Sequence, residues 1–248
     1  MKSFPFAGLR PATDDRHAQW TLESLRPPPG VAFRVPPGFD AIIRIHHDLQ
    51  DGRPWDTIED VDDLRRATAL PCPLPDDLKT VAGELSDEQV DLLVPVLGRS
   101  TESATLIHFA QWMGWGDLER GSRTSIMRHA TEAARRENDR MNAERELAAE
   151  PIYAFVEQCP QIDWWGGRTM FLFDGPIEAV RTVGFEFVAE EGGVLRRCPQ
   201  WWWPSDRSWF VASEIDDPCT YVSGTKELIR EIDQLPLDTR RVNITDYW

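Results

Sequence analysis

Tryptophan is concentrated in one stretch of this chain, and that stretch constrains the fold more than any other. Trp201, Trp202, Trp203 and Trp209 lie within nine residues, although the 248 residues hold only eleven tryptophans. Indole rings bury large apolar areas, so the stretch must form either a corner of the core or a site. Side chains alternate along a strand, so one of the three consecutive rings must face away from the other two. We therefore expect most rings to pack in the core and one to be partly exposed.

Charged residues accompany these rings. Glu214 and Asp216 lie two apart in a predicted strand, 208–215, and its continuation, which places both carboxylates on one face. Such a pair can perform acid–base chemistry or hold a divalent cation. With no third ligand evident, we expect ion pairs with Arg207 or Arg168 instead. The residues Asp206 and Arg207 follow a proline, which predicts a tight turn with a local salt bridge. The candidate binding residues are thus Trp202, Trp203, Asp206, Arg207, Trp209, Glu214 and Asp216.

No catalytic residue, metal ligand or cofactor site is predicted. The chain has no G-x-S-x-G, G-x-x-x-x-G-K-[ST] or G-x-G-x-x-G motif, and its four cysteines form no C-x-x-C pair. His46 and His47 are adjacent on a strand and point to opposite faces, so they do not form a two-histidine metal pair. His108 lies alone in an apolar strand, where a hydrogen-bonded core histidine is expected. A Ser-His-Asp triad stays an open alternative, because the sequence alone does not show which residues are close in space.

The order of predicted elements favours an α+β fold with a mostly antiparallel sheet and flanking helices. Strands are expected at 41–47, 105–112, 168–173, 184–189, 208–215 and 220–222, and a strand or short helix at 152–158. Helices are expected at 57–70, 86–97 and 225–235; Ser86 and Gln89 form a capping box in the second. Residues 122–150 predict a long charged helical insertion with a thin apolar stripe, exposed as an arm. We expect residues 1–38 to be a proline-rich segment packed on the surface of a single domain, 39–248.

The net charge of the chain indicates which classes of partner it can bind. A net charge of −15 and a pI near 4.7 disfavour binding to nucleic acid or to anionic lipid. The same charge would speed encounter with a basic protein. No apolar run is long enough for a signal peptide or a membrane span, so a cytoplasmic location is expected.

Several segments together resemble an uncharacterised family of actinobacterial proteins. They are Ile45 to His47, Trp112 to Gly116, Arg168 to Pro176 and, most specifically, Trp202 to Trp209, followed by 212–216 and 220–224. The last segments match the pattern Trp-Trp-Pro-x-Asp-Arg-x-Trp, then Glu-Ile-Asp and Thr-Tyr-Val-x-Gly. The resemblance implies no activity.

Three functions are compatible with these features. The favoured one is a non-enzymatic acidic binding protein, immunity- or antitoxin-like, that contacts a basic protein partner. The second is a small-ligand-binding protein or hydrolase with a tryptophan-lined acidic cleft. The third is a structural protein that forms oligomers through helix 122–150. Whether the chain oligomerises is not predicted.

Overall fold

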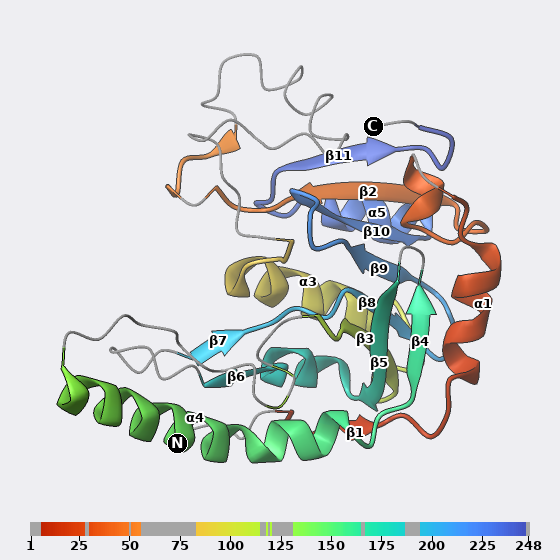
Figure 1. Ribbon diagram of the computed structural model, residues 1–248. Helices are drawn as coiled ribbons and strands as arrows, with labels where there is room; N and C mark the ends of the chain where they lie inside the picture. The colour runs from red at the N-terminus through yellow and green to blue at the C-terminus, as the bar shows by residue number, and fades with distance from the viewer. Residues whose placement is uncertain are drawn as a thin grey trace.

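A nine-stranded antiparallel sheet organises the molecule (Figure 1). The computed structural model describes residues 6–27, 30–49, 51–55, 83–114, 118, 120, 131–164, 167–186 and 194–246. Eight strands follow one another in the order β1 (Arg10–Pro11), β5 (Arg168–Gly175), β3 (Ile107–Trp112), β8 (Trp201–Pro204), β9 (Phe210–Ser213), β10 (Cys219–Gly224), β2 (Ala41–His46) and β11 (Thr239–Val242). The ninth, β4 (Gln161–Trp164), pairs with β5, and a separate ribbon joins β6 (Gly184–Glu186) to β7 (Val194–Arg196). The predicted α+β class and mostly antiparallel sheet are confirmed.

Both faces of the sheet are covered. One face, which we call the α3 face, packs against α3 (Asp87–Arg99), α5 (Lys226–Ile232), η3 (Ile177–Thr182) and the last turns of α4 (Glu132–Val156). The other, the α1 face, packs against α1 (Arg16–Ser24) and against Phe33 of the short helix η1 (Val31–Phe33). Strands buried on both sides read as continuous apolar runs, and this accounts for the fully buried pattern of β8, β9 and β10.

Helix α3, which covers the α3 face of the sheet, shows how the local sequence sets the bounds of a helix. Ser86 accepts a hydrogen bond from the backbone N–H of Gln89, whose side chain caps Ser86 in return, as the capping box predicts. The stripe Val90, Leu93, Val94 and Leu97 is buried. Pro95 lies on the exposed side of the helix, and the helix continues past it to Arg99.

Some predicted boundaries differ from the observed ones. Residues 152–156, predicted as a strand or a short helix, are helical and continue α4. The strand predicted at 208–215 is too long, because β9 ends at Ser213 and a turn follows. The two-residue strand β1 and the edge strand β11 lie in polar segments that carry too little apolar pattern to reveal a strand. The helix predicted at 57–70 and residues 122–130 of the helix predicted at 122–150 lie outside the described residues.

Helix α4 runs along one end of the molecule, and in Figure 1 its first turns reach past β6 and β7. Its last turns enter the core through Ala149, Ile152, Tyr153 and Val156, whereas Leu147 is 76% exposed. Of the helices in the described ranges, none has the length and apolarity needed to cross a membrane.

Candidate functional site

The tryptophan stretch lies inside the molecule. Trp202 packs in the core of the α3 face, and Trp201 and Trp203 pack in the core of the α1 face. The alternation of the three rings is therefore as predicted. The prediction that one ring is partly exposed is wrong, since all four are at most 1% exposed: Trp201, Trp202, Trp203 and Trp209. A helix covers each face of the sheet, so neither side of β8 leaves a ring open to solvent.

The predicted site residues Asp206 and Arg207 form the turn after β8. The carboxylate of Asp206 accepts hydrogen bonds from Thr101 Oγ1 at 2.7 Å and from the backbone N–H groups of Glu102 and Ser208. Partial burial acts to raise the pKa of Asp206, but these hydrogen bonds outweigh it and lower that pKa. Arg207 adopts a positive φ of 55°, and its guanidinium lies 4.8 Å from the ring centre of Trp20. The predicted salt bridge between Asp206 and Arg207 is not found in the described part of the chain.

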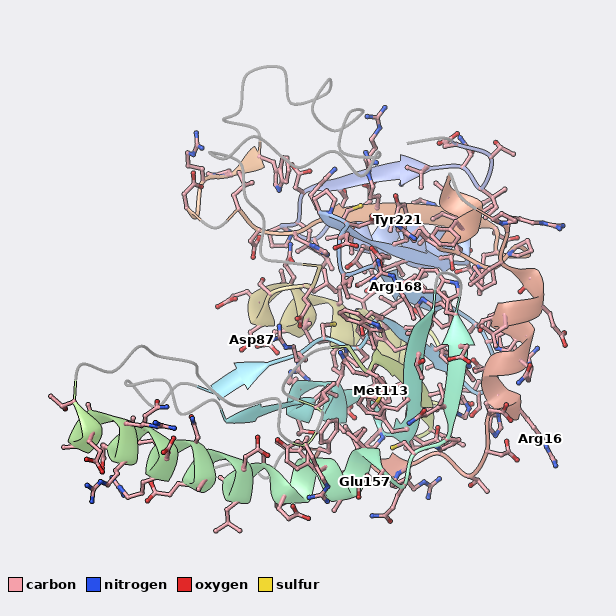
Figure 2. The ribbon with its side chains drawn as sticks, viewed as in Figure 1. Arg16, Asp87, Met113, Glu157, Arg168 and Tyr221 are labelled. Atoms are coloured by element: carbon pink, nitrogen blue, oxygen red, sulfur yellow. The ribbon has the colours of Figure 1, made fainter. Side chains whose placement is uncertain are left out.

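Glu214 and Asp216 meet Arg168, as the ion-pair interpretation expects. Arg168 Nη2 lies 2.9 Å from Glu214 Oε1 and 2.7 Å from Asp216 Oδ2. Figure 2 shows Arg168 at the start of β5 and, well away from it, Glu157, the residue that follows the last turn of α4. A second arginine, Arg34, forms a two-point contact with Asp217 and approaches Glu214. Burial raises the pKa of Glu214, against the opposing effect of Arg34 and Arg168. Two arginines thus pair with three carboxylates in this cluster, and such ion pairing favours a structural role.

Three other residues form an arrangement of a different kind, which we call the Ser205 triad. His108 Nδ1 lies 2.7 Å from Asp174 Oδ1, and His108 Nε2 lies 2.9 Å from Ser205 Oγ. His108 and Asp174 are buried, and Ser205 is exposed. A buried carboxylate, a histidine and an accessible hydroxyl in this order are the parts of a nucleophilic hydrolase site.

The register of three neighbouring strands brings the triad together. His108 on β3 is directly opposite Asp174 on β5 and directly opposite Trp203 on β8. β8 ends at Pro204, and Ser205 is the first residue of the turn that follows it. Two paired strands therefore supply Asp174 and His108, and a turn at the end of a third strand supplies Ser205.

The contacts of His108 accommodate the tautomer that a serine nucleophile needs. In the neutral imidazole whose Nδ1–H donates to Asp174, Nε2 is left as the acceptor. Ser205 Oγ then donates to Nε2, and the carbonyl of Leu106, at 3.3 Å, is its longer alternative acceptor. This tautomer is the one in which histidine can take a proton from serine.

The surroundings of the triad add a stacking ring. The imidazole of His17 on α1 stacks on that of His108, with ring centres 4.3 Å apart and planes 15° from parallel. In the turn itself, the backbone N–H of Ser205 donates to Leu106 O, and that of Arg207 donates to Pro204 O.

Sequence reasoning placed none of the triad among the candidate site residues. His108 was expected to be a core histidine with its hydrogen bonds made, and it is buried and bonded as expected. Its partners are 66 and 97 residues away in sequence. The available signal was the strand pairing, because a polar residue in an apolar strand needs a polar partner on the strand beside it.

Comparison with protein-family models, with curated proteins and with solved structures found no match. The resemblance to an actinobacterial family stays a prediction. Within the described ranges, no three histidine, cysteine, aspartate or glutamate side chains lie together as metal ligands would.

Proposed function

We propose that this protein is a hydrolase that acts through a covalent acyl intermediate on Ser205. The observation that carries the proposal is the pair of short contacts that join Ser205, His108 and Asp174 in one line, with the serine exposed. The surrounding sheet supports it, because the paired strands β3 and β5 hold His108 and Asp174 opposite each other. In the family pattern the position of Ser205 is unspecified, so the proposal concerns this chain and not the family.

The chemistry follows from the geometry. Ser205 Oγ attacks the carbonyl carbon of an ester while His108 Nε2 takes the serine proton. Asp174 holds the Nδ1–H and stabilises the imidazolium that forms. The tetrahedral oxyanion collapses, the alcohol leaves with the proton from His108, and the acyl group stays on Ser205. Water then attacks this ester with His108 again as the base, which releases the acid and restores the serine.

A fluorophosphonate probe tests the proposal directly, since it phosphonylates a serine only when a base activates it. We expect one equivalent to add to Ser205, identified by peptide mass. Ser205→Ala should abolish labelling, and Asp174→Asn should slow it by roughly 100-fold or more, because the amide favours the wrong tautomer of His108.

Ser208→Ala is the matched control, because Ser208 lies in the same turn. It should label at the wild-type rate. Labelling of Ser205 no faster than that of other serines, in a protein whose circular dichroism is native, would refute the proposal.

The acidic binding protein is the second candidate, and a specific surface favours it. The first turns of α3 carry Asp87, Glu88 and Asp91, and η3, which packs against α3, adds Glu178. Arg181 pairs with Asp91 at this surface. The net charge of −15 favours a basic protein partner, as in an immunity or antitoxin protein.

Affinity capture from the native host tests this candidate. A basic protein should bind wild type in stoichiometric amount and should bind Glu88→Gln/Glu178→Gln at least tenfold more weakly. The exposed control Glu23→Gln, on α1, should retain binding. Equal capture by all three chains would count against this surface.

Helix α4, as a charged insertion, carries the third candidate, a structural protein that assembles with copies of itself. The exposed Leu147 favours it. Sedimentation analysis should then show an oligomer that Leu147→Glu converts to a monomer. A wild-type protein that stays monomeric at about 10⁻⁴ M would exclude this candidate.

A further inference from the structure

A ring on helix α1 covers the histidine of the Ser205 triad. His17 stacks on His108, with ring centres 4.3 Å apart and planes 15° from parallel. His17 is exposed, whereas His108 is only 3% exposed. The imidazole of His17 is therefore part of the cover that separates His108 from solvent.

The two hydrogen bonds of His108 depend on the plane in which its ring lies. Nδ1 lies 2.7 Å from Asp174 Oδ1, and Nε2 lies 2.9 Å from Ser205 Oγ. Both nitrogens form hydrogen bonds in the plane of the imidazole, so a rotation about the Cβ–Cγ bond disturbs both contacts at once. That torsion is intrinsically broad in histidine. A contact on the face of the ring resists the rotation, and His17 supplies such a contact.

Trp20 anchors the helix that carries His17. It lies three residues further along α1, on the same side of the helix. Its ring centre is 5.7 Å from that of Phe210 and 6.4 Å from that of Trp203, and both contacts are edge-on. The ring centre of Trp203 is in turn 5.7 Å from that of His108. The helix and these ring contacts form a closed circuit, which holds His17 over its partner.

The backbone of α1 keeps the same orientation. Ala18 and Thr21 are fully buried, so this side of the helix is docked on the sheet. Arg16, the residue before His17, has a side chain that is 86% exposed. Figure 2 shows the Arg16 side chain extending away from the sheet. Neighbouring positions on α1 therefore have opposite surroundings, and only one of them contacts the triad.

The stacked geometry separates two roles that a second histidine could have. A proton relay needs a nitrogen of one ring to point at a nitrogen of the other, and imidazole nitrogens donate and accept in the ring plane. In rings whose planes are only 15° from parallel, the nitrogens of His17 do not point at those of His108. The contact is made by the ring faces, so packing is the role that the geometry favours.

We propose that His17 is a positioning residue for the reaction at Ser205, an inference that rests on the proposed hydrolase function. Its flat ring keeps His108 in the plane in which Nδ1 faces Asp174 and Nε2 faces Ser205. It also keeps water from the face of the imidazole, which strengthens both hydrogen bonds. A flat ring without nitrogens should serve equally well.

Fluorophosphonate labelling of Ser205 tests this role in the full-length protein. His17→Ala removes the ring and should slow labelling roughly three- to tenfold, the range expected for the loss of one aromatic pair. His17→Phe keeps a flat ring and should label within about twofold of wild type. Arg16→Ala is the matched control from the outer side of α1 and should label at the wild-type rate.

A second measurement needs no reaction. Long-range ¹H–¹⁵N NMR spectra of the histidine rings distinguish a protonated ring nitrogen from a bare one. In wild type and in His17→Phe, His108 should show a protonated Nδ1 and a bare Nε2. In His17→Ala the two nitrogens should shift toward a mixture of tautomers, because the ring is free to turn away from Asp174.

Two labelling results would overturn the inference and leave the hydrolase proposal standing. One is a wild-type rate for His17→Ala in a protein of native circular dichroism. The other is labelling of His17→Phe as slow as that of His17→Ala, which would show that a nitrogen of His17 is needed. If wild type is not labelled, the hydrolase proposal fails and the NMR spectra decide. The same His108 tautomer in all three proteins overturns the positioning role, and a change confined to His17→Ala supports it.

Discussion

His47 is a single residue whose burial should control the pH dependence of stability. It is fully buried beside His46, and burial lowers its pKa from 6.5 to about 3. In the unfolded chain the same ring titrates near its usual pKa of about 6.5. Between about pH 3 and about pH 6.5 the imidazole of His47 is protonated in the unfolded chain and neutral in the folded chain. The contribution of His47 is therefore fully present above about pH 6.5 and is lost as the pH falls toward 3.

Urea unfolding between pH 4 and pH 7 measures this effect. The free energy of unfolding of wild type should rise with pH by up to about 1.4 kcal/mol per unit more than that of His47→Gln. The variant keeps an amide nitrogen near Thr220 but cannot take up a proton. Parallel profiles for the two proteins would show that His47 is not the titrating group.

Some contacts of single residues could be predicted from the sequence. The alternation of Trp201, Trp202 and Trp203 follows from strand geometry, the ion pairing of Glu214 with Arg168 follows from charge, and both are found. The contact of His108 with Ser205 depends on strand pairing across 97 residues. No local pattern encodes that pairing, so the triad became visible only with the sheet.

At the scale of one element, the capping box of α3 should contribute measurably to stability. Ser86 accepts from the N–H of Gln89, which otherwise has no partner in the first turn. Ser86→Ala should lower the free energy of unfolding by about 1 kcal/mol. Ser100→Ala, at the other end of the same helix, removes only a hydrogen bond to Val96 O and serves as the control. Chemical denaturation should rank Ser86→Ala as the less stable, and equal losses would contradict the cap.

Helices and strands with strong local signals were predicted close to their observed bounds. The range 41–47 contains β2, and 86–97 matches α3 because a cap and an apolar stripe agree there. The edge strand β11 was missed, since Thr239, Arg240 and Arg241 pair with β2 through their backbone and carry no apolar alternation. Backbone pairing at a sheet edge leaves little trace in side-chain pattern.

At the scale of the whole molecule, the sheet should be equally sensitive to loss of apolar volume on both faces. Trp202 lies in the core of the α3 face and Trp203 in that of the α1 face, and both are buried. Trp202→Ala and Trp203→Ala should each cost about 3–5 kcal/mol in free energy of unfolding. A cost below about 1 kcal/mol for either one would mean that its face is open in solution.

The strand order has a consequence for how the chain reaches this state. β2 is synthesised early, yet its neighbours β10 and β11 come from residues 219–242, and β3 waits for β5 and β8. A nascent chain that lacks these later segments leaves both strands with unpaired edges, which are open to association with other chains. Bringing strands together over such long separations costs chain entropy before any contact forms, so this pairing is slow. The sheet can therefore be completed only after residues 219–242 have left the ribosome, and until then residues 41–46 lack both of their partner strands.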